Sequence, residues 1–106
     1  MMKEQVIQLQ IIKFLKARGF TVGKTKTMGV RRGRAFCFDP YVFRGFPDLV
    51  AFINKRIVFI EVKSEMGKQS YDQIVFQKLA EDAGLTYLLA RSVEDVSALL
   101  ETLTKD

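Results

Sequence analysis

The stretch DLVAFINKRIVFIEVK (residues 48–63) decides the fold of this chain. It contains two near-continuous apolar runs, 48–53 and 56–63, which are joined by the dipeptide Asn54-Lys55. Two such runs with so short a connection predict a β-hairpin. Because neither run alternates with polar residues, we expect both strands to be buried on both faces and therefore to lie at the centre of a sheet.

Charged residues stand at one end of this hairpin. Counting back from the turn pairs Asp48 with Glu61. The two-residue period of a strand places Lys63 on the same face as Glu61. Two carboxylates and a lysine are therefore expected to converge at one edge of a buried sheet. Adjacent carboxylates repel each other, and burying them is costly unless something positive lies between them.

A divalent cation between the two carboxylates would meet this requirement. Mg²⁺ prefers oxygen ligands and usually takes one or two carboxylates, while water and substrate phosphates complete its shell. A protonated Lys63 is no ligand, but it can hold an attacking water or stabilise charge on a phosphate. The combination is typical of metal-assisted phosphodiester hydrolysis, which needs no histidine.

The alternative is a structural one. Glu61 and Lys63 could form a surface ion pair at a fraying strand end, with Asp48 capping a turn after Pro47. A lone Glu-x-Lys is frequent by chance and would favour that explanation. The joint order of Pro-Asp, a hairpin-sized gap and Glu-x-Lys is much more specific and favours the metal site.

Helical and strand-like patterns flank the hairpin. An amphipathic pattern predicts a first helix that ends at Gly19. Ser70 begins a second helix with Gly84 as its cap, and Ser92 begins a third. The expected order α-β-β-β-α-β-α indicates an α/β fold with helices flanking a mixed central sheet. The helices are expected at about 3–18, at 70–83 and from 92 onward, and further strand-like stretches at 20–26, 34–39 and 85–90, with VRRG (30–33) near a turn.

Length and composition indicate a single domain that spans residues 1–106. The chain is 48% hydrophobic and 27% charged, which is ordinary for a globular protein, and it is too short for a second core. Its apolar runs are far too short for a membrane span, and its start does not resemble a signal peptide. Cys37 is the only cysteine and there is no histidine. An internal disulfide framework, a Cys/His zinc site and a histidine base are thereby excluded, and we expect a reducing, intracellular setting.

The net charge of +5 is concentrated in the middle of the chain. Residues 21–60 hold eight basic and two acidic residues, a net +6, so the remainder of the chain sums to −1. A basic middle segment favours a polyanionic partner, most simply nucleic acid. Aromatic residues within 41–46 could stack on the bases of such a partner, or cover a dimer interface.

Five basic residues are candidates for contacts with DNA. Arg31, Arg32 and Arg34 could clamp phosphates, or simply solvate a hairpin turn. Arg44 and Lys68 flank the two charged segments and are better placed to contact DNA near the scissile bond.

Two residues on the inward stripes of the predicted helices are further candidates for the site. Glu4 precedes Ile7 by three positions, although a carboxylate in the first turn also favours the helix dipole. Gln73 precedes Phe76 by three positions, although its distance from Ser70 is the spacing of a capping box. Each residue can serve both roles, because a side chain in the first turn can also point into a site.

Taken together, RGFPD (44–48) and, twelve residues later, EVK (61–63) resemble the PD-(D/E)xK nuclease signature. The continuation GKQSYDQIVFQKLAEDAG (67–84), then YLLARSVEDV (87–96), is similar to the VRR-NUC family, particularly to its small stand-alone phage and bacterial members. The segment with Glu4 and Gln8, ahead of IIKFLKARGF, is also similar to that family's first helix. The similarity runs over nearly the whole chain and is weakest at residues 27–44.

The resemblance implies a restriction-endonuclease-like core that cleaves DNA with Mg²⁺ or Mn²⁺. The match assigns the carboxylates of Asp48 and Glu61 and the backbone carbonyl of Val62 to the metal. It assigns Lys63, the helix-borne glutamine Gln73 and the first-helix acid Glu4 to catalysis.

Stand-alone members of the family resemble Holliday-junction resolvases, and the resemblance implies a homodimer. Two sites related by a two-fold axis can cut symmetric strands of a branched substrate. We therefore expect a structure-selective DNA endonuclease, acting on branched DNA such as a Holliday junction, with no membrane partner and no small-molecule cofactor. Its expected location is the cytoplasm of a bacterium, or of the host if the chain is phage-encoded.

Two other classes of protein compete with this interpretation. The first is a DNA-binding module that keeps the fold without turnover, and the intact Asp48, Glu61 and Lys63 argue against it. The second is a small-molecule α/β enzyme, and the absence of a glycine-rich phosphate loop after a strand counts against that class.

Overall fold

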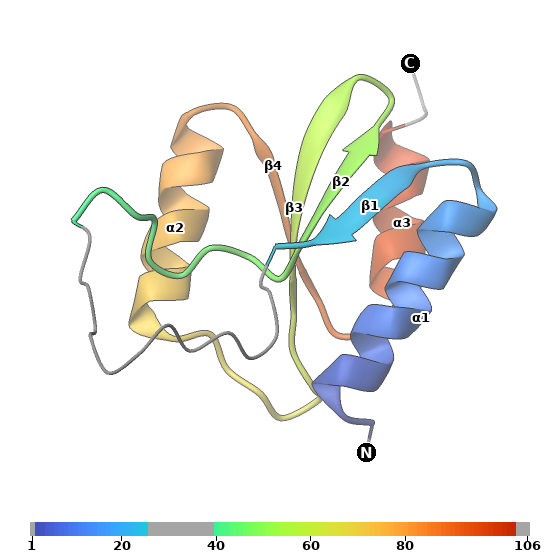
Figure 1. Ribbon diagram of the computed structural model, residues 1–106, viewed down its shortest axis with the longest axis horizontal. Helices are drawn as coiled ribbons and strands as arrows, with labels where there is room; N and C mark the ends of the chain where they lie inside the picture. The colour runs from blue at the N-terminus through green and yellow to red at the C-terminus, as the bar shows by residue number, and fades with distance from the viewer. Residues whose placement is uncertain (1, 26–39, 104–106) are drawn as a thin grey trace, which may run out of the picture.

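The computed structural model describes residues 2–25 and 40–103 (Figure 1). Its elements follow in the expected order α-β-β-β-α-β-α. They are α1 (Glu4–Ala17), β1 (Thr21–Lys24), β2 (Leu49–Ile53), β3 (Arg56–Val62), α2 (Tyr71–Asp82), β4 (Thr86–Ala90) and α3 (Val93–Leu103). The strand expected at 34–39 and three of the candidate DNA contacts lie outside the described residues. Those three are Arg31, Arg32 and Arg34.

β2 and β3 form the expected antiparallel hairpin. Leu49 pairs with Ile60, so the register is the one predicted from the length of the turn. The turn residues Asn54 and Lys55 have φ angles of 51° and 68°. A left-handed conformation at both central residues is typical of the type I′ turn, whose twist matches that of the two strands it joins.

The four strands of the described residues form one mixed sheet in the order β1-β2-β3-β4. β1 and β2 are antiparallel, as are β2 and β3, whereas β3 and β4 are parallel. Parallel neighbours need a crossover connection, and α2 lies on the crossover from β3 to β4. The two hairpin strands are therefore the central strands of the sheet, as their apolar sequences predict.

Helices cover both faces of the sheet (Figure 1). α1 and α3 cover one face, where the larger hydrophobic core lies. α2 covers the other face, where a smaller hydrophobic core lies. The first core consists of Ile7, Ile11, Leu15, Val22, Leu49, Ala51, Ile53, Val58, Ile60, Val62, Ala90, Val96, Leu100 and Leu103. The second consists of Phe76, Ala80 and Tyr87, with Phe46 and Phe59 packed against them. Because strand residues alternate between faces, Glu61 and Lys63 lie on the α2 face with Phe59.

The turn end of the hairpin is less buried than expected. Phe52 and Ile57 pair with each other, and their exposed fractions are 56% and 48%. Both lie on the face that carries α2, since Ile57 is two residues from Phe59. The expectation of burial on both faces is therefore wrong for this end of the hairpin, because one helix does not cover the full length of the strands.

Two glycines follow the helix ends where the sequence predicts them. Gly19 follows α1 and Gly84 follows α2, both with positive φ.

α1 is the longest helix in the described part of the chain, with 14 residues. A bilayer takes about 20 residues to cross, so none of the described helices is long and apolar enough to span a membrane.

Candidate active site

Asp48 lies next to the end of β3, as the hairpin register predicts. It immediately precedes β2, and Leu49 pairs with Ile60, so the next position on each strand brings Asp48 opposite Glu61. The Asp48 carboxylate accepts a hydrogen bond of 2.9 Å from the backbone N–H of Val62. This contact fixes the carboxylate at the edge of the sheet.

The backbone of Asp48 is fixed from the other side by Thr25, which follows β1. The N–H of Thr25 donates to the carbonyl oxygen of Asp48 at 3.0 Å. The Thr25 hydroxyl is within hydrogen-bond distance of the carbonyl oxygens of Pro47 and Asp48. Sequence reasoning missed this residue, because a threonine at a strand end carries no signal of its partner 23 positions away.

Glu61 is the one buried charged residue of the described chain, with an exposed fraction of 1%. Its Oε2 lies 3.6 Å from Lys63 Nζ, and the Lys63 side chain is 13% exposed. The two residues are on one face of β3, as strand periodicity predicts. They do not form the exposed ion pair of a fraying strand end, because both side chains are largely removed from water.

Gln73 joins the start of α2 to Glu61. Its Nε2 donates a hydrogen bond of 2.8 Å to Glu61 Oε2. Its Oε1 accepts from the backbone N–H of Ser70 at 2.8 Å, while the Ser70 hydroxyl accepts from the N–H of Gln73. The capping box is therefore complete, and the same side chain also reaches the buried carboxylate.

Gly45 lets the loop before β2 pack directly on the first turn of α2. Its φ is 69°, a left-handed conformation. A Cβ at this position would lie 2.5 Å from the backbone nitrogen of Gln73 and inside contact distance of the carbonyl group of Asp72. Only glycine fits this approach without a shift of backbone. The loop that carries Asp48 and the helix that carries Gln73 are thus held against each other.

The structure does not group Glu4 with Asp48 and Glu61 into a set of three metal ligands. Glu4 is half-buried in the first turn of α1. Its Oε2 lies beside Gly67, 3.4 Å from where a Cβ of that glycine would be. Within residues 2–25 and 40–103, no three acidic, cysteine or histidine side chains are grouped so that they could hold a metal. The catalytic role of Glu4 stays a prediction.

Aromatic side chains pack together as a layer on the α2 face of the sheet, which also carries Glu61 and Lys63. Phe59, Phe46 and Phe76 contact each other edge to face at centroid distances of 5.1 to 5.6 Å. Phe46 is thus part of the packed core, whereas Tyr41 and Phe43 are 93% and 62% exposed. The motif residue Phe46 therefore serves the fold, and Phe43 contacts Phe46 and Phe76 while more than half of its surface stays exposed.

Tyr87 extends this layer, and the charges of the site carboxylates affect its pKa. The pKa of Tyr87 is raised to about 12, chiefly by burial; the hydrogen bond from Gln69 opposes the rise, and the negative charges of Glu61 and Asp48 add to it. Gln69 Nε2 donates to the Tyr87 hydroxyl at 3.2 Å and to Gln77 Oε1 at 3.0 Å. The neutral phenol is therefore the favoured form beside the site.

Comparison with known proteins finds similarity to solved structures. No protein-family model and no curated protein matches the sequence. A solved structure described as "VRR_NUC domain" is similar to the fold with a TM-score of 0.70 and 25% identity, covering 95% of this chain and 97% of that one. This match supports the VRR-NUC family. A second, "VRR_NUC domain protein", has a TM-score of 0.69 at 17% identity over 94% and 86% of the two chains, and adds a likeness of fold.

The VRR-NUC likeness fits the expected restriction-endonuclease-like core and supports a nuclease-type domain. The match extends over nearly the full length of both chains, so it includes the hairpin, α1 and α2 that hold the charged residues. The sequence motif and the fold therefore point to the same family.

The donor set of this site fits a divalent cation with oxygen ligands. Asp48 and Glu61 supply two carboxylates from adjoining strands. The N–H of Val62 points to Asp48, and in a strand the carbonyl of a residue points to the same neighbour as its N–H. Mg²⁺ usually takes one or two carboxylates and keeps several waters, so it does not need a third acidic side chain.

The candidate DNA contacts are only partly placed. Arg44 and Lys68 are exposed and lie on the loops before β2 and before α2. Arg31, Arg32 and Arg34 lie outside the described residues. The two placed residues flank the site in the chain, as predicted, and stay candidates.

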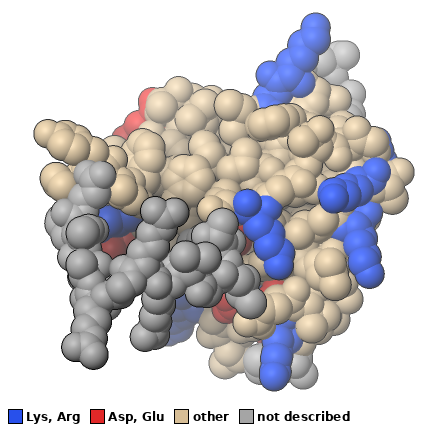
Figure 2. Space-filling view, in the orientation of Figure 1, with Lys and Arg blue, Asp and Glu red and all other residues tan. Residues whose placement is uncertain are grey.

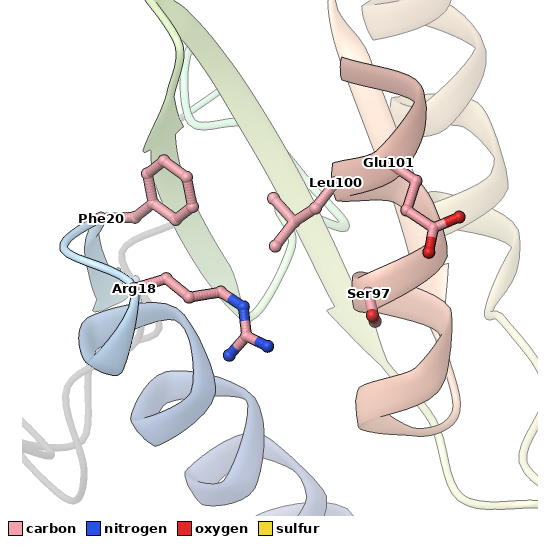
Figure 3. Close-up of a pocket in the computed structure, with 5 residues that line it drawn as sticks. All are labelled: Arg18, Phe20, Ser97, Leu100 and Glu101. Atoms are coloured by element: carbon pink, nitrogen blue, oxygen red, sulfur yellow. The ribbon is translucent and has the colours of Figure 1, made fainter. Parts of the chain in front are cut away.

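A surface hollow elsewhere on the described part of the chain is separate from this site. Figure 3 shows it between the end of α1 and α3, and its volume is about 440 Å³. Arg18, Phe20, Ser97, Leu100 and Glu101 line it, with Leu100 directed toward Phe20 and Glu101 turned away (Figure 3). None of the motif residues is among them. The hollow lies by the helices of the opposite face of the sheet from Glu61.

Proposed function

We propose that this VRR-NUC domain is a metal-dependent endonuclease that hydrolyses phosphodiester bonds of DNA. One observation carries the proposal: the buried Glu61 carboxylate lies 3.6 Å from Lys63 Nζ and opposite Asp48. A fold gains little from burying a carboxylate and an ammonium at a strand end. Such an arrangement suits metal-assisted hydrolysis of a charged phosphodiester.

Each residue has a role that its position supports. Asp48 and Glu61, with the carbonyl of Val62, would hold Mg²⁺ or Mn²⁺. Such an ion, when bound, supplies Lewis acidity toward the scissile phosphate. Lys63 can hold the attacking water or stabilise negative charge on the phosphate from its place beside Glu61. Gln73 orients the Glu61 carboxylate through its 2.8 Å hydrogen bond.

Charge supports DNA as the substrate. The chain carries a net charge of +5, and residues 21–60 alone carry +6. In Figure 2, Lys and Arg side chains project from the rim and from the middle of the visible face, whereas few acidic atoms reach its surface. Positive charge at the surface attracts the phosphate backbone and raises the rate of encounter.

Branched DNA, including Holliday junctions, is the proposed substrate, and a homodimer the proposed active form. A two-fold dimer presents two sites of opposite polarity, which suits symmetric incisions. The loop before β2 offers exposed apolar side chains for such a contact, because Tyr41, Val42 and Phe43 are 93%, 64% and 62% exposed. Glu4 is proposed as an additional acid near the site.

Incubation with linear, flapped and four-way DNA, in Mg²⁺, Mn²⁺ or EDTA, tests this function. We expect cleavage only with a metal, and fastest on the four-way substrate. Asp48→Asn and Lys63→Met should each lower the single-turnover rate at least about 100-fold with the fold intact by circular dichroism. Both removed groups act on the charge that develops in the transition state.

Asp82→Asn and Lys78→Met are the matched controls, because this pair is 63% and 77% exposed on α2. Undiminished cleavage by both site variants would overturn the site assignment. Tight binding of DNA without cleavage in any metal would instead identify the non-catalytic DNA-binding module.

A further inference from the structure

An arginine outside the nuclease motif holds the turn that follows Lys63. Arg91 Nη1 donates hydrogen bonds to the carbonyl oxygens of Ser64 and Gly67, both at 2.7 Å, and lies 3.3 Å from that of Glu65. The turn is closed by a 3.1 Å hydrogen bond from the N–H of Gly67 to the carbonyl of Ser64. Hydrogen bonds from a charged donor are stronger than those between neutral groups.

Arg91 is itself fixed by the corner between β4 and α3. Its backbone N–H donates to the Asp95 carboxylate at 2.8 Å, and the N–H of Asp95 donates to the Ser92 hydroxyl at 3.4 Å. The preceding residue, Ala90, accepts a 3.0 Å hydrogen bond from the backbone N–H of Lys63. The same corner therefore contacts both Lys63 and the turn after it.

This turn lies between three parts of the candidate active site. It begins after Lys63 on β3, and three residues beyond it Ser70 starts the helix that carries Gln73. Gly67, at the end of the turn, lies beside the Glu4 carboxylate of α1. A shift of the turn would therefore change the relation of Lys63, Gln73 and Glu4.

We propose that Arg91 is a positioning residue of the active site, which acts by fixing the 64–67 turn behind Lys63. The inference rests on the proposed nuclease function. It differs from a phosphate-binding role, in which Arg91 would contact the DNA itself. Its three contacts with main-chain carbonyls come from a single nitrogen, so a lysine at this position would keep some of them and a methionine none.

Arg91→Met and Arg91→Lys test the proposal, with Arg18→Met as control, because Arg18 is exposed and stacks on Phe14 far along α1. We expect Arg91→Met to lower the single-turnover cleavage rate by about 10- to 100-fold, since small misplacement of reacting groups is enough for such a loss. Arg91→Lys should recover part of the rate. The dissociation constant for the same DNA in EDTA should stay within about twofold, because a positioning residue does not itself touch a phosphate.

Hydrogen exchange of the Gly67 amide, followed by NMR, gives a readout that is independent of cleavage. This amide should exchange faster in Arg91→Met, less so in Arg91→Lys, and unchanged in Arg18→Met. Unchanged exchange and rate in Arg91→Met would overturn the proposal, and DNA binding weakened in parallel with the rate would favour the phosphate contact. If the unsubstituted protein cuts no DNA, the proposed nuclease function is wrong. Faster exchange in Arg91→Met would still establish that Arg91 fixes the 64–67 turn.

Discussion

Glu61 is held in an environment that disfavours a charge, and its neighbours compensate for the burial. An ionised carboxylate that leaves water loses a large hydration energy unless it is paired and hydrogen-bonded. Lys63 supplies the opposite charge and Gln73 an N–H donor. Both partners lie on the α2 side of the sheet, so the carboxylate depends on β3 and α2 together.

The phenol of Tyr87 offers a test of this environment through the pH dependence of stability. Its pKa is raised to about 12 in the folded chain, against 10.0 ordinarily. Stability from the buried neutral phenol is complete below pH 10 and is lost as the pH rises toward 12. Between pH 9 and pH 11 we expect the free energy of unfolding of the unsubstituted protein to fall by about 1 kcal/mol more than that of Tyr87→Phe.

Urea denaturation at the two pH values measures this difference. Lysine and arginine titration is common to both proteins and cancels in the comparison. Tyr71→Phe is the control, because Tyr71 is 79% exposed, and it should behave as the unsubstituted protein does. An equal loss of stability in Tyr87→Phe and the unsubstituted protein would show that the phenol titrates normally.

At the scale of elements, the loop before β2 and the first turn of α2 behave as one unit. Gly45 permits their contact, and Gly45→Ala would place a methyl group against the backbone of Asp72 and Gln73. We expect a loss of about 2 to 4 kcal/mol in unfolding free energy, from the left-handed φ and from overpacking together. Cleavage should fall even where the variant is folded, because Gln73 moves relative to Glu61.

Denaturation and single-turnover cleavage below the melting temperature separate these two effects. Gly23→Ala is the matched control, since nothing lies within 4 Å of a Cβ there. A Gly45→Ala variant with normal stability and rate would mean that the loop and the helix are not in contact as described.

Much of the architecture follows from local pattern. The paired runs and the two-residue connection were enough to predict the hairpin, its register and its central place, because period and turn length act over a few residues. The capping box of Ser70 and Gln73 was equally readable. The exposure of Phe52 and Ile57 was not, since it depends on how far α2 reaches across the sheet.

The site was predictable to the extent that it lies on one hairpin. Asp48, Glu61 and Lys63 come together through strand register alone. Thr25 and Arg91 did not appear among the candidates, because each acts on main-chain carbonyls more than 20 positions away. Such contacts leave no spacing in the sequence, and only the packed sheet brings them together.

At the scale of the whole molecule, the basic residues determine how binding responds to salt. Each phosphate of duplex DNA that a basic side chain neutralises contributes about 0.9 to the slope of log K against log salt. We expect Arg31→Gln combined with Arg32→Gln to weaken binding and to reduce this slope by about 2. Fluorescence anisotropy over a range of salt of about 50 to 300 mM measures the slope.

A double variant of equal charge, Lys55→Gln with Lys78→Gln, provides the comparison. Lys55 lies in the hairpin turn at the end remote from Asp48, and Lys78 is exposed on α2. A slope that changes equally in both double variants would indicate a general effect of net charge. An unchanged slope in the arginine variant would mean that Arg31 and Arg32 solvate a turn.

The burial of Glu61 and Lys63 also bears on how such a domain changes over generations. Replacing a buried ion pair with apolar residues of similar volume is often neutral or stabilising. Here the pair lies on the face of the sheet on which Phe59 packs against Phe76, so two apolar substitutions would extend an existing core. Under selection for thermal stability alone, the ion pair would therefore be replaced, and the result would be an inactive protein with the same fold. A lineage that retains the pair has been under continued selection for the function of the pair.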